Sequence, residues 1–409
     1  MMSKTENRTV VIIGAGPSGS IASAILHQKG HDVVVIEKEQ FPRFCIGESL
    51  LSHCLDFIEE AGMLDAVHQA GFQLKHGAAF SWGDRYTEFD FRQGFTSGKG
   101  TTFEVPRGDF DKLLADQAVA QGVEIRYQHT VQTVNFEGKP LLHIRTSEGD
   151  EYDIQADFVL DASGYGRVLP RLLSLETPSN LPPRRAVFTH IEDNITSAKY
   201  NREKILITTH PVFRDVWFWL IPFSNGRASI GVVGLPERYE GYPEDLGLCL
   251  QQFVHDVPHL KEILANAKWD TPFREIKGYS ANVKTLCGDG FALLGNAAEF
   301  LDPVFSSGVT IAMRSASMAA GLLDRQLKGE LVNWQQEFAQ PLMVGVNTFR
   351  TYVEGWYNGT FQDVIFYEHA NEDIRKMVCS ILAGYAWDMS NPFVADAKRK
   401  LDVVYQLCQ

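Results

Sequence analysis

The feature that most constrains the fold is a glycine-rich turn that follows directly on a run of β-branched residues near the start of the chain. Val10 to Ile13 is a short apolar run, and the residues after it have the spacing G-x-G-x-x-G. The small residues of Ser20 to Lys29 predict a helix, and His31 to Glu37 predict a second buried strand. A strand, a helix and a strand in this order form a βαβ unit, which requires a parallel sheet.

The spacing of the glycines suits a pyrophosphate group. Gly14 allows a tight turn, Gly16 lets the backbone approach the phosphates, and Gly19 lets the helix pack closely on the strand. Free N–H groups at the helix N-terminus, around Pro17 and Ser18, attract the anion. Glu37 closes the second strand, where an acidic residue binds a ribose hydroxyl and disfavours a 2′-phosphate. The motif therefore predicts a dinucleotide site, and an ordinary glycine-rich turn is the alternative.

Charge and cysteine usage exclude several classes of function. The 409 residues contain 38 Lys and Arg against 51 Asp and Glu, a net charge of −13. Such a chain is a poor partner for nucleic acid or for an anionic membrane surface. The six cysteines are scattered and form no C-x-x-C pair, so we expect neither a disulfide scaffold nor a metal site. The polar N-terminus lacks the apolar core of a signal peptide, and we expect a soluble, cytoplasmic protein.

A second glycine-rich segment, residues 94–102, imitates a phosphate-binding P-loop. Gly100 follows Lys99 in the place where a P-loop requires Ser or Thr, and the glycine spacing is also wrong. We interpret this segment as a mobile loop.

Three further segments bear on which dinucleotide is bound. They are Pro106 to Leu114, with the pattern R-x-x-F-D-x-x-L; Asp157 to Gly164; and Gly288 to Ala298. Together with the first glycines they resemble the flavoprotein monooxygenases of the p-hydroxybenzoate-hydroxylase type. The resemblance implies an α/β fold in which a Rossmann-type FAD-binding domain is discontinuous and holds an inserted β-sheet domain. We expect the FAD-binding domain at 1–185 and 275–327. The β-sheet substrate domain is expected at 186–274 with part of 75–105, and a helical region covering the substrate at 328–409.

Four details resemble the flavin-dependent halogenases more specifically. Asn296 stands where the hydroxylases usually carry Asp, and Trp217 to Pro222 matches the family signature W-x-W-x-I-P. Phe300 to Gly308 resembles the stretch that lines the flavin and the halide site in that family. Phe72 to Gly83, preceded by Ile46 to Leu50, resembles the segment of the catalytic lysine, which is Lys75 here.

This resemblance implies a reaction path. Reduced FAD (FADH2), supplied by a separate flavin reductase, reacts with O₂ to give a flavin hydroperoxide, which oxidises chloride or bromide to hypohalous acid. That species travels through a tunnel to Lys75, which presents it to an electron-rich ring. The halide is expected on the N–H groups of Ser307 and Gly308, and the tunnel wall is expected to include Trp217, Trp219, Pro222 and Phe305. The residues expected to hold the cofactor are Gly14, Gly16, Pro17, Ser18, Gly19, Glu37, Lys38, Arg43, Ile46, Gly47, Glu48, Ser49, Arg107, Asp161, Ala162, Ser163, Gly295, Asn296, Asp302 and Pro303.

The substrate is narrowed by the same resemblance. Phe305 stands where tryptophan halogenases carry Glu, which disfavours free tryptophan. The aromatic C-terminal segment resembles halogenases of pyrrole and phenol rings, and a pyrrolyl thioester on an acyl or peptidyl carrier protein is the preferred substrate. Arg184 to Arg185 and Lys398 to Lys400 are candidate docking residues for such an acidic partner. The alternatives are a phenol halogenase, a non-halogenating FAD-dependent oxidoreductase and a flavin-binding partner protein without catalysis of its own.

The residues alone leave simpler alternatives open. A lysine at position 75 is more often a solvated charge, although desolvation would lower its pKa and make it reactive. Trp217 and Trp219 point to one face of a strand, as core residues do. The serines before Gly308 could cap the following helix as well as bind an anion.

Overall fold

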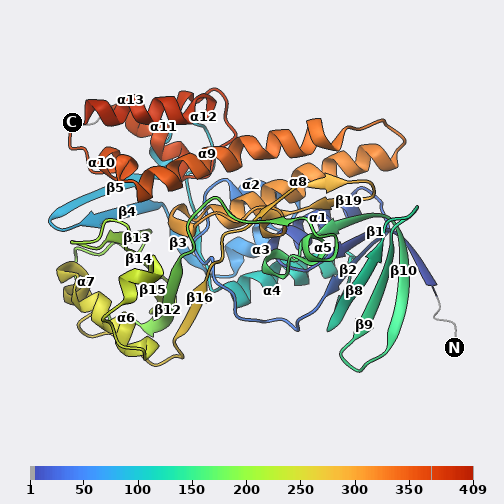
Figure 1. Cartoon of the computed structure of the whole chain (residues 1–409), viewed down its shortest axis with the longest axis horizontal. Coiled ribbons are helices and arrows are strands. Elements are labelled where there is room, and N and C mark those ends of the chain that lie inside the picture. Colours follow the sequence, from blue (N-terminus) through green and yellow to red (C-terminus); the bar gives the residue numbers. More distant parts are fainter. Residues whose placement is uncertain (1–4, 370, 409) are drawn as a thin grey trace.

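A mostly parallel sheet forms the first of two β-layers in the computed structural model, which describes residues 5–369 and 371–408 (Figure 1). Its strand order is β18-β19-β10-β1-β2-β7, and the hairpin β8–β9 extends it beside the first half of β10. The strands β7, β2, β1, β10 and β19 are parallel to their neighbours in this order. The bounds are β1 Thr5–Ile13, β2 Val33–Glu37, β7 Glu124–Tyr127, β8 His129–Asn135, β9 Leu141–Thr146, β10 Glu151–Asp161, β18 Cys287–Gly288 and β19 Phe291–Leu293.

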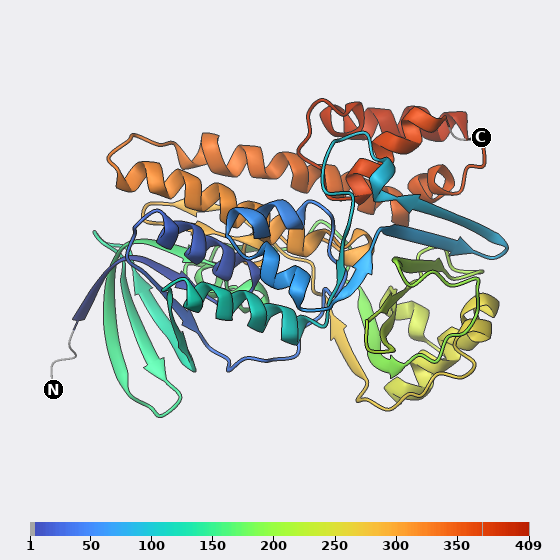
Figure 2. The same ribbon diagram turned by 180° about the vertical axis from the view of Figure 1, so that it is seen from behind.

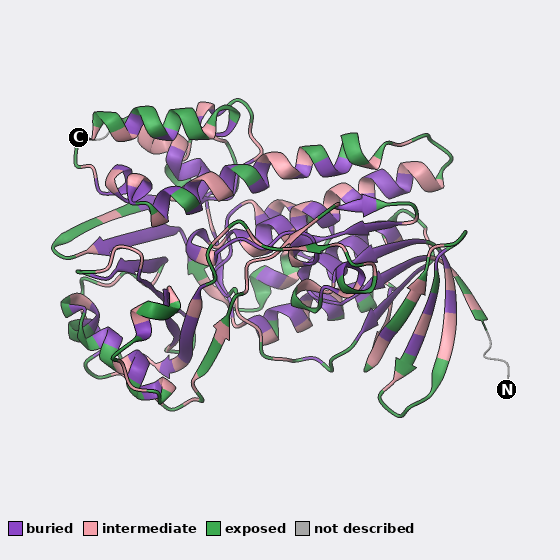
Figure 3. Cartoon of the chain, in the orientation of Figure 1, coloured by how far each residue is buried: buried purple, intermediate pink, exposed green. Residues whose placement is uncertain are grey.

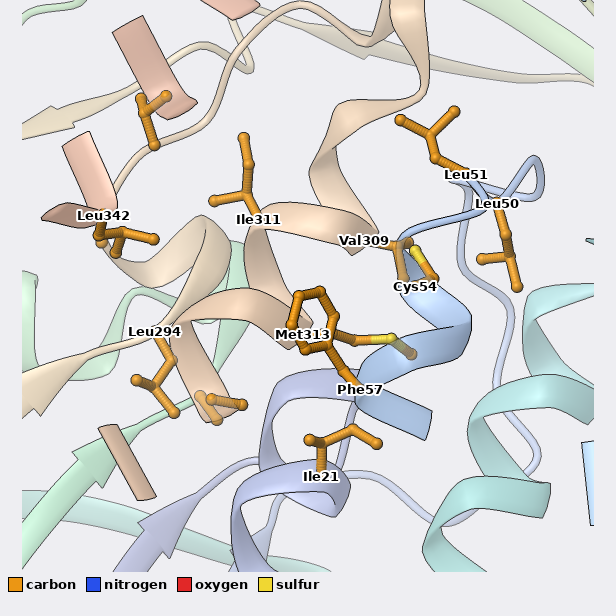
Figure 4. Packing of buried hydrophobic residues seen from close by; sticks show 14 of the residues in the cluster. Ile21, Leu50, Leu51, Cys54, Phe57, Leu294, Val309, Ile311, Met313 and Leu342 are labelled. Atoms are coloured by element: carbon orange, nitrogen blue, oxygen red, sulfur yellow. The ribbon is translucent and has the colours of Figure 1, made fainter. Parts of the chain in front are cut away.

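Helices cover this sheet because small and apolar side chains line their inner faces. The first, α1, is buried along nearly its whole length and packs along α8 (Figure 2). Ile21 of α1, Phe57 of α2 and Met313 of α8 lie in one hydrophobic cluster (Figure 4). The bounds are α1 Pro17–Gln28, α2 Cys54–Glu60, α3 Leu64–Gln69, α4 Arg107–Ala120, α5 Val168–Leu172 and α8 Ser307–Leu327.

A second, seven-stranded sheet has the order β16-β12-β15-β14-β13-β4-β5. Its pairs are antiparallel except for β13 and β4. Along β14 the side chains alternate: Trp217 and Trp219 join the main core, whereas Phe218 packs with α6 in a separate cluster. The bounds are β4 Gly77–Trp82, β5 Arg85–Asp90, β12 Arg185–Glu192, β13 Lys204–Thr209, β14 Trp217–Pro222, β15 Arg227–Gly234, β16 Arg274–Lys277, α6 Leu246–His255 and α7 Pro258–Ile263.

The remaining elements join and cover the two sheets. Two short ladders, β3 with β6 and β11 with β17, lie in the connections. The last helices lie above both sheets, with buried residues on their inner sides and exposed residues outside (Figures 1 and 3). The bounds are β3 Gln73–Lys75, β6 Thr102–Glu104, β11 Glu176–Thr177, β17 Asn282–Val283, α9 Gln340–Tyr357, α10 Thr360–Ile365, α11 Glu372–Leu382, α12 Pro392–Ala395 and α13 Ala397–Leu407.

The predicted fold class is confirmed, with local differences. Two short helices, α2 and α3, lie between β2 and β3, and the chain turns between them at Gly62, whose φ is +69°. Residues 94–102, expected to form a mobile loop, are held by hydrogen bonds: Thr96 bonds Ser380 and Asp388, and the Lys99 amide donates to the Tyr385 hydroxyl.

The predicted domain boundaries stay a prediction, and β16 continues the second sheet past residue 274. Residues 1–4, 370 and 409 of those predicted segments lie outside the described residues.

Among residues 5–369 and 371–408, we find no helix with the length and apolar character needed to cross a membrane.

Gly19 should be intolerant of any side chain. A Cβ there would lie 1.8 Å from the carbonyl oxygen of Gly14, a backbone atom that cannot move aside. We expect Gly19→Ala to lower the free energy of unfolding by about 3 kcal/mol or more. Gly321 is the matched control, because a Cβ at this position of α8 meets nothing within 4 Å. Gly321→Ala should raise the free energy of unfolding by about 1 kcal/mol, and denaturant titration of both variants measures the contrast.

Candidate functional site

The main cavity, of about 700 Å³, opens between the two sheets. It lies beyond the carboxyl ends of β1, β2 and β10, the edge at which ligands bind in open parallel sheets. The second sheet contributes Trp217 and Trp219 to the opposite wall. The predicted site residues that line the cavity are Gly14, Gly16, Pro17, Ser18, Glu37, Lys38, Arg43, Ile46, Gly47, Glu48, Ser49, Arg107, Ala162, Ser163, Trp217, Trp219, Asn296, Pro303 and Gly308.

The glycine turn has the shape that a dinucleotide needs. Gly14 has a φ of +99°, and a Cβ there would lie 2.6 Å from the carbonyl oxygen of Ala162. At Gly16 a Cβ would meet only the end of the Arg43 side chain, at 3.5 Å, so the missing side chain leaves the backbone open to the cavity. The first N–H groups of α1 have no partners within the helix, and a pyrophosphate fits beside them.

Glu37 is held rigidly at the cavity wall. One carboxylate oxygen accepts from the Ala15 amide at 2.8 Å, and the other accepts from the Glu39 amide at 2.8 Å. The side chain is almost fully buried yet lines the cavity. Each oxygen keeps a lone pair, so a ribose hydroxyl can donate to it.

A buried arginine fixes the segment that follows β2. Arg107 donates twice to Asp111, at 2.8 and 3.0 Å, and once to the carbonyl of Ile46, at 2.8 Å. Gly47 approaches this guanidinium so closely that a Cβ would lie 2.9 Å from it. The segment 46–49 therefore keeps one conformation along the cavity.

Eight predicted site residues lie behind the wall rather than on it. Asp161 is fully buried and accepts from the amides of Ser163 and Leu169, so it shapes the turn after β10. Asp302 is also buried and accepts from the Tyr279 hydroxyl. The full set is Gly19, Lys75, Asp161, Pro222, Gly295, Asp302, Phe305 and Ser307.

Lys75 is fully buried at the end of β3, so its interpretation as a solvated charge is wrong. Its Nζ donates to the Ser49 hydroxyl and to the Leu50 carbonyl, both at 2.7 Å, and lies 5.3 Å from the centre of the Phe91 ring. Burial lowers the pKa of Lys75, while the Glu104 carboxylate acts in the opposite direction. Ser49 also lines the cavity, so the amine is hydrogen-bonded to a residue of the cavity wall.

Trp217 and Trp219 belong both to the hydrophobic core and to the wall of the cavity. Their ring centres are 6.0 Å apart. Trp217 donates to the Tyr357 hydroxyl at 2.8 Å, and Trp219 donates to the Ser229 hydroxyl at 3.0 Å. Gly231 makes room for Trp219, since a Cβ there would lie 2.3 Å from the indole. Both rings are therefore fixed where they face the cavity.

The N-terminus of α8 also opens to the cavity through Ser306, Gly308 and Val309. Ser306 precedes the helix with a φ of +56°, and its side chain makes no capping bond. The amides of the first helical turn, which begins at Ser307, have no helical partners and attract an anion.

Sequence reasoning missed several residues of this site. Phe44, Tyr165 and His129 line the cavity, and His190 bonds the buried Glu48 at 2.6 Å. Phe44 lies between Arg43 and Ile46, which the sequence assigned to the cofactor site, and this position could have identified it. No sequence motif marks Glu104, which is buried beside Lys75. Of the candidate docking residues, Arg184 is wrong, because it is buried against the Tyr357 ring.

Comparison with known proteins identifies the class. The family described as "FAD binding domain" matches residues 7–334. The chain is 31% identical to the 1H-pyrrole-2-carbonyl peptidyl-carrier-protein chlorinase of Pseudomonas fluorescens over 76% of this chain and 74% of that protein. A flavoprotein/dehydrogenase from Cytophaga hutchinsonii superposes with a TM-score of 0.94 at 43% identity, covering 99% of both chains. The flavin-dependent brominase Bmp2 superposes with a TM-score of 0.85 at 26% identity, covering 98% of this chain and all (100%) of that chain.

The protein is thus an FAD-binding enzyme. It belongs to the flavin-dependent halogenase family, and the resemblance stated from the sequence is confirmed. The roles assigned to single residues stay predictions.

Glu37 should contribute to FAD affinity. Glu37→Ala removes the acceptor predicted for the ribose and leaves the Ala15 amide without its partner. We expect FAD to bind about tenfold or more weakly, the effect of losing a hydrogen bond to a charged group. Quenching of flavin fluorescence on titration with protein measures the affinity. Glu148→Ala, at an exposed turn, is the control and should bind as the parent does. Equal affinity of Glu37→Ala and the parent would contradict the ribose contact.

Proposed function

We propose that this halogenase acts on a pyrrolyl group carried as a thioester on an acyl or peptidyl carrier protein. It would use chloride or bromide, O₂ and reduced FAD from a separate flavin reductase. The observation that carries the proposal is the full burial of Lys75, whose amine is hydrogen-bonded to Ser49 of the cavity wall. The name of the Pseudomonas fluorescens relative, a chlorinase of a carrier-bound pyrrole, supports the substrate class. Phe305, in place of the glutamate expected for free tryptophan, agrees with it.

The residues present fit FAD, and different residues would bind its pyrophosphate, its ribose and the halide. The open backbone at Gly16 and the N-terminus of α1 would hold the pyrophosphate, and Glu37 the ribose. When bound, reduced FAD would supply two electrons to O₂, and the partly reduced oxygen would accept the two electrons that the halide loses. The first amides of α8, at Ser307 and Gly308, would hold the halide by hydrogen bonding and by the positive end of the helix dipole.

The tryptophan wall and Lys75 would control the second half of the reaction. Trp217 and Trp219 are fixed by their indole hydrogen bonds, and they would keep the aromatic substrate out of the cofactor cavity. Lys75 would receive the oxidised halogen and aim it at the ring. Burial favours the neutral amine of Lys75, whose lone pair and N–H groups can hold an electrophilic halogen species.

A second candidate is a non-halogenating FAD-dependent oxidoreductase. The observation in its favour is the flavoprotein/dehydrogenase from Cytophaga hutchinsonii at 43% identity. The two candidates differ in whether halide is consumed.

Mass spectrometry of a pyrrolyl-loaded carrier protein tests the proposal. The protein is incubated with FAD, a flavin reductase, NADH, O₂ and either bromide or chloride. We expect halogen-isotope mass shifts with the parent, and a loss of about 100-fold or more in Lys75→Ala, the scale of removing a group that acts directly in the chemistry. Lys112→Ala, an exposed lysine of α4, is the control and should keep the parental yield.

Two other outcomes of this experiment would each assign a different function. Shifts that appear with free phenols and not with the pyrrolyl carrier would assign a phenol halogenase. Oxidation of reduced flavin without halogenation of any ring would favour the oxidoreductase.

A further inference from the structure

A fully buried carboxylate lies beside Lys75 without a function assigned to it. Glu104 ends β6 and has no exposed surface. Neither carboxylate oxygen has a hydrogen-bond partner that meets the usual geometry in the described part of the chain. An ionised carboxylate in such surroundings is unfavourable unless a nearby group compensates for it. A stable ionised Glu104 therefore requires a compensating group close to its carboxylate.

The ladder between β3 and β6 brings Glu104 and Lys75 together. Lys75 pairs with Thr102, and Gln73 pairs with Glu104. Opposite residues and residues two apart share a face of a ladder, so Lys75 and Glu104 are diagonal neighbours on one face. Long side chains reach across such a diagonal.

Ser49 connects the two groups. It forms an isolated antiparallel bridge with Glu104, and its hydroxyl oxygen accepts from Lys75 Nζ at 2.7 Å. A hydroxyl that accepts one hydrogen bond still has its own hydrogen to donate. Glu104 offers two acceptors without other partners, and hydrogen bonding from Ser49 stabilises its ionised form.

We propose that Glu104 is the proton partner of Lys75, and that one proton moves between the amine and the carboxyl group through the Ser49 hydroxyl. In one state the pair is ammonium and carboxylate, and in the other it is neutral amine and carboxylic acid. The net charge of the pair is zero in both, so the transfer adds no uncompensated charge to the interior. Glu104 is thus a positioning residue that leaves the Lys75 lone pair free when an electrophile arrives. The use of that lone pair rests on the proposed function.

The surroundings agree with a shared proton. Burial raises the pKa of Glu104 to about 7, although Lys75 and Ser49 lower it, and Glu48 raises it further. Burial also lowers the pKa of Lys75, so the two values approach each other. The other groups that interact with the pair are the Cys54 thiol and the buried Tyr200 hydroxyl.

The pH dependence of stability tests the pair without any substrate. With one shared proton, the pair binds one proton in the folded and in the unfolded parent between about pH 5 and about pH 9, so it adds no pH dependence to stability there. Glu104→Gln removes the compensating carboxylate, and burial lowers the pKa of Lys75 in the folded variant below its unfolded value of 10.5. The variant therefore gains stability as pH rises towards the unfolded pKa of Lys75, and we expect the Tm of the parent relative to Glu104→Gln to fall between about pH 6 and about pH 9. Glu148→Gln, at an exposed turn, should show a constant difference. A constant difference for Glu104→Gln would overturn the proposal.

The halogenation assay tests the consequence for Lys75. We expect Glu104→Gln to lower halogen transferred per flavin oxidised by about tenfold or more at neutral pH, without raising the KM for the carrier substrate. The acidic limb of the parental pH profile should shift in this variant, and Glu104→Asp should restore part of the yield. A parental yield and profile in Glu104→Gln would overturn the proposal. If the parent halogenates no ring, the proposed function fails, and the Tm series still decides whether the pair shares a proton.

Discussion

The approach of the glycine turn to the end of β10 is the contact on which the cofactor cavity depends. The Gly14 backbone lies against the carbonyl of Ala162, and Gly19 lies against the carbonyl of Gly14. No side chain fits in either gap, so α1 starts at a fixed point beside the two central strands. Glu37 is then tied to the same turn through the Ala15 amide. Strand, turn, helix and carboxylate therefore form one rigid unit, and the cavity takes its shape from that unit.

A second constraint joins this unit to Lys75. Arg107 of α4, which is paired with Asp111, donates to the carbonyls of Ile46 and Gly47, and that segment leads directly to Ser49 and Leu50. Both atoms that bond Lys75 Nζ come from these two residues. The amine is thus positioned by the same loop that lines the cofactor cavity. A displacement of α4 would move the cavity wall and Lys75 together, which explains why the last residue of β3 can be buried and still be placed accurately.

The sequence predicted what depends on local pattern and on motifs. The βαβ unit follows from periodicity and glycine placement, and the helix expected after Gly308 is α8. Most residues quoted from motifs line the cavity, but Asp161 and Gly295 support the turns behind it, because a motif does not distinguish contact from support. The burial of Lys75 and the presence of Glu104 beside it could not be predicted. They depend on the pairing of β3 with β6, across residues that are far apart in sequence.

The burial of Lys75 separates its amine from the cofactor cavity. A lysine at the cavity surface would meet water and stay an ammonium ion, with no lone pair to offer. In its buried position, its charge is opposed by desolvation and is supported by two neutral oxygens, a ring, the diagonal carboxylate and Cys54. The balance lowers the pKa of the amine. The tryptophan wall on the other side keeps the cavity rigid. Under the proposed function, oxidation of halide and its transfer to a ring would then proceed in separate surroundings, each suited to its own step.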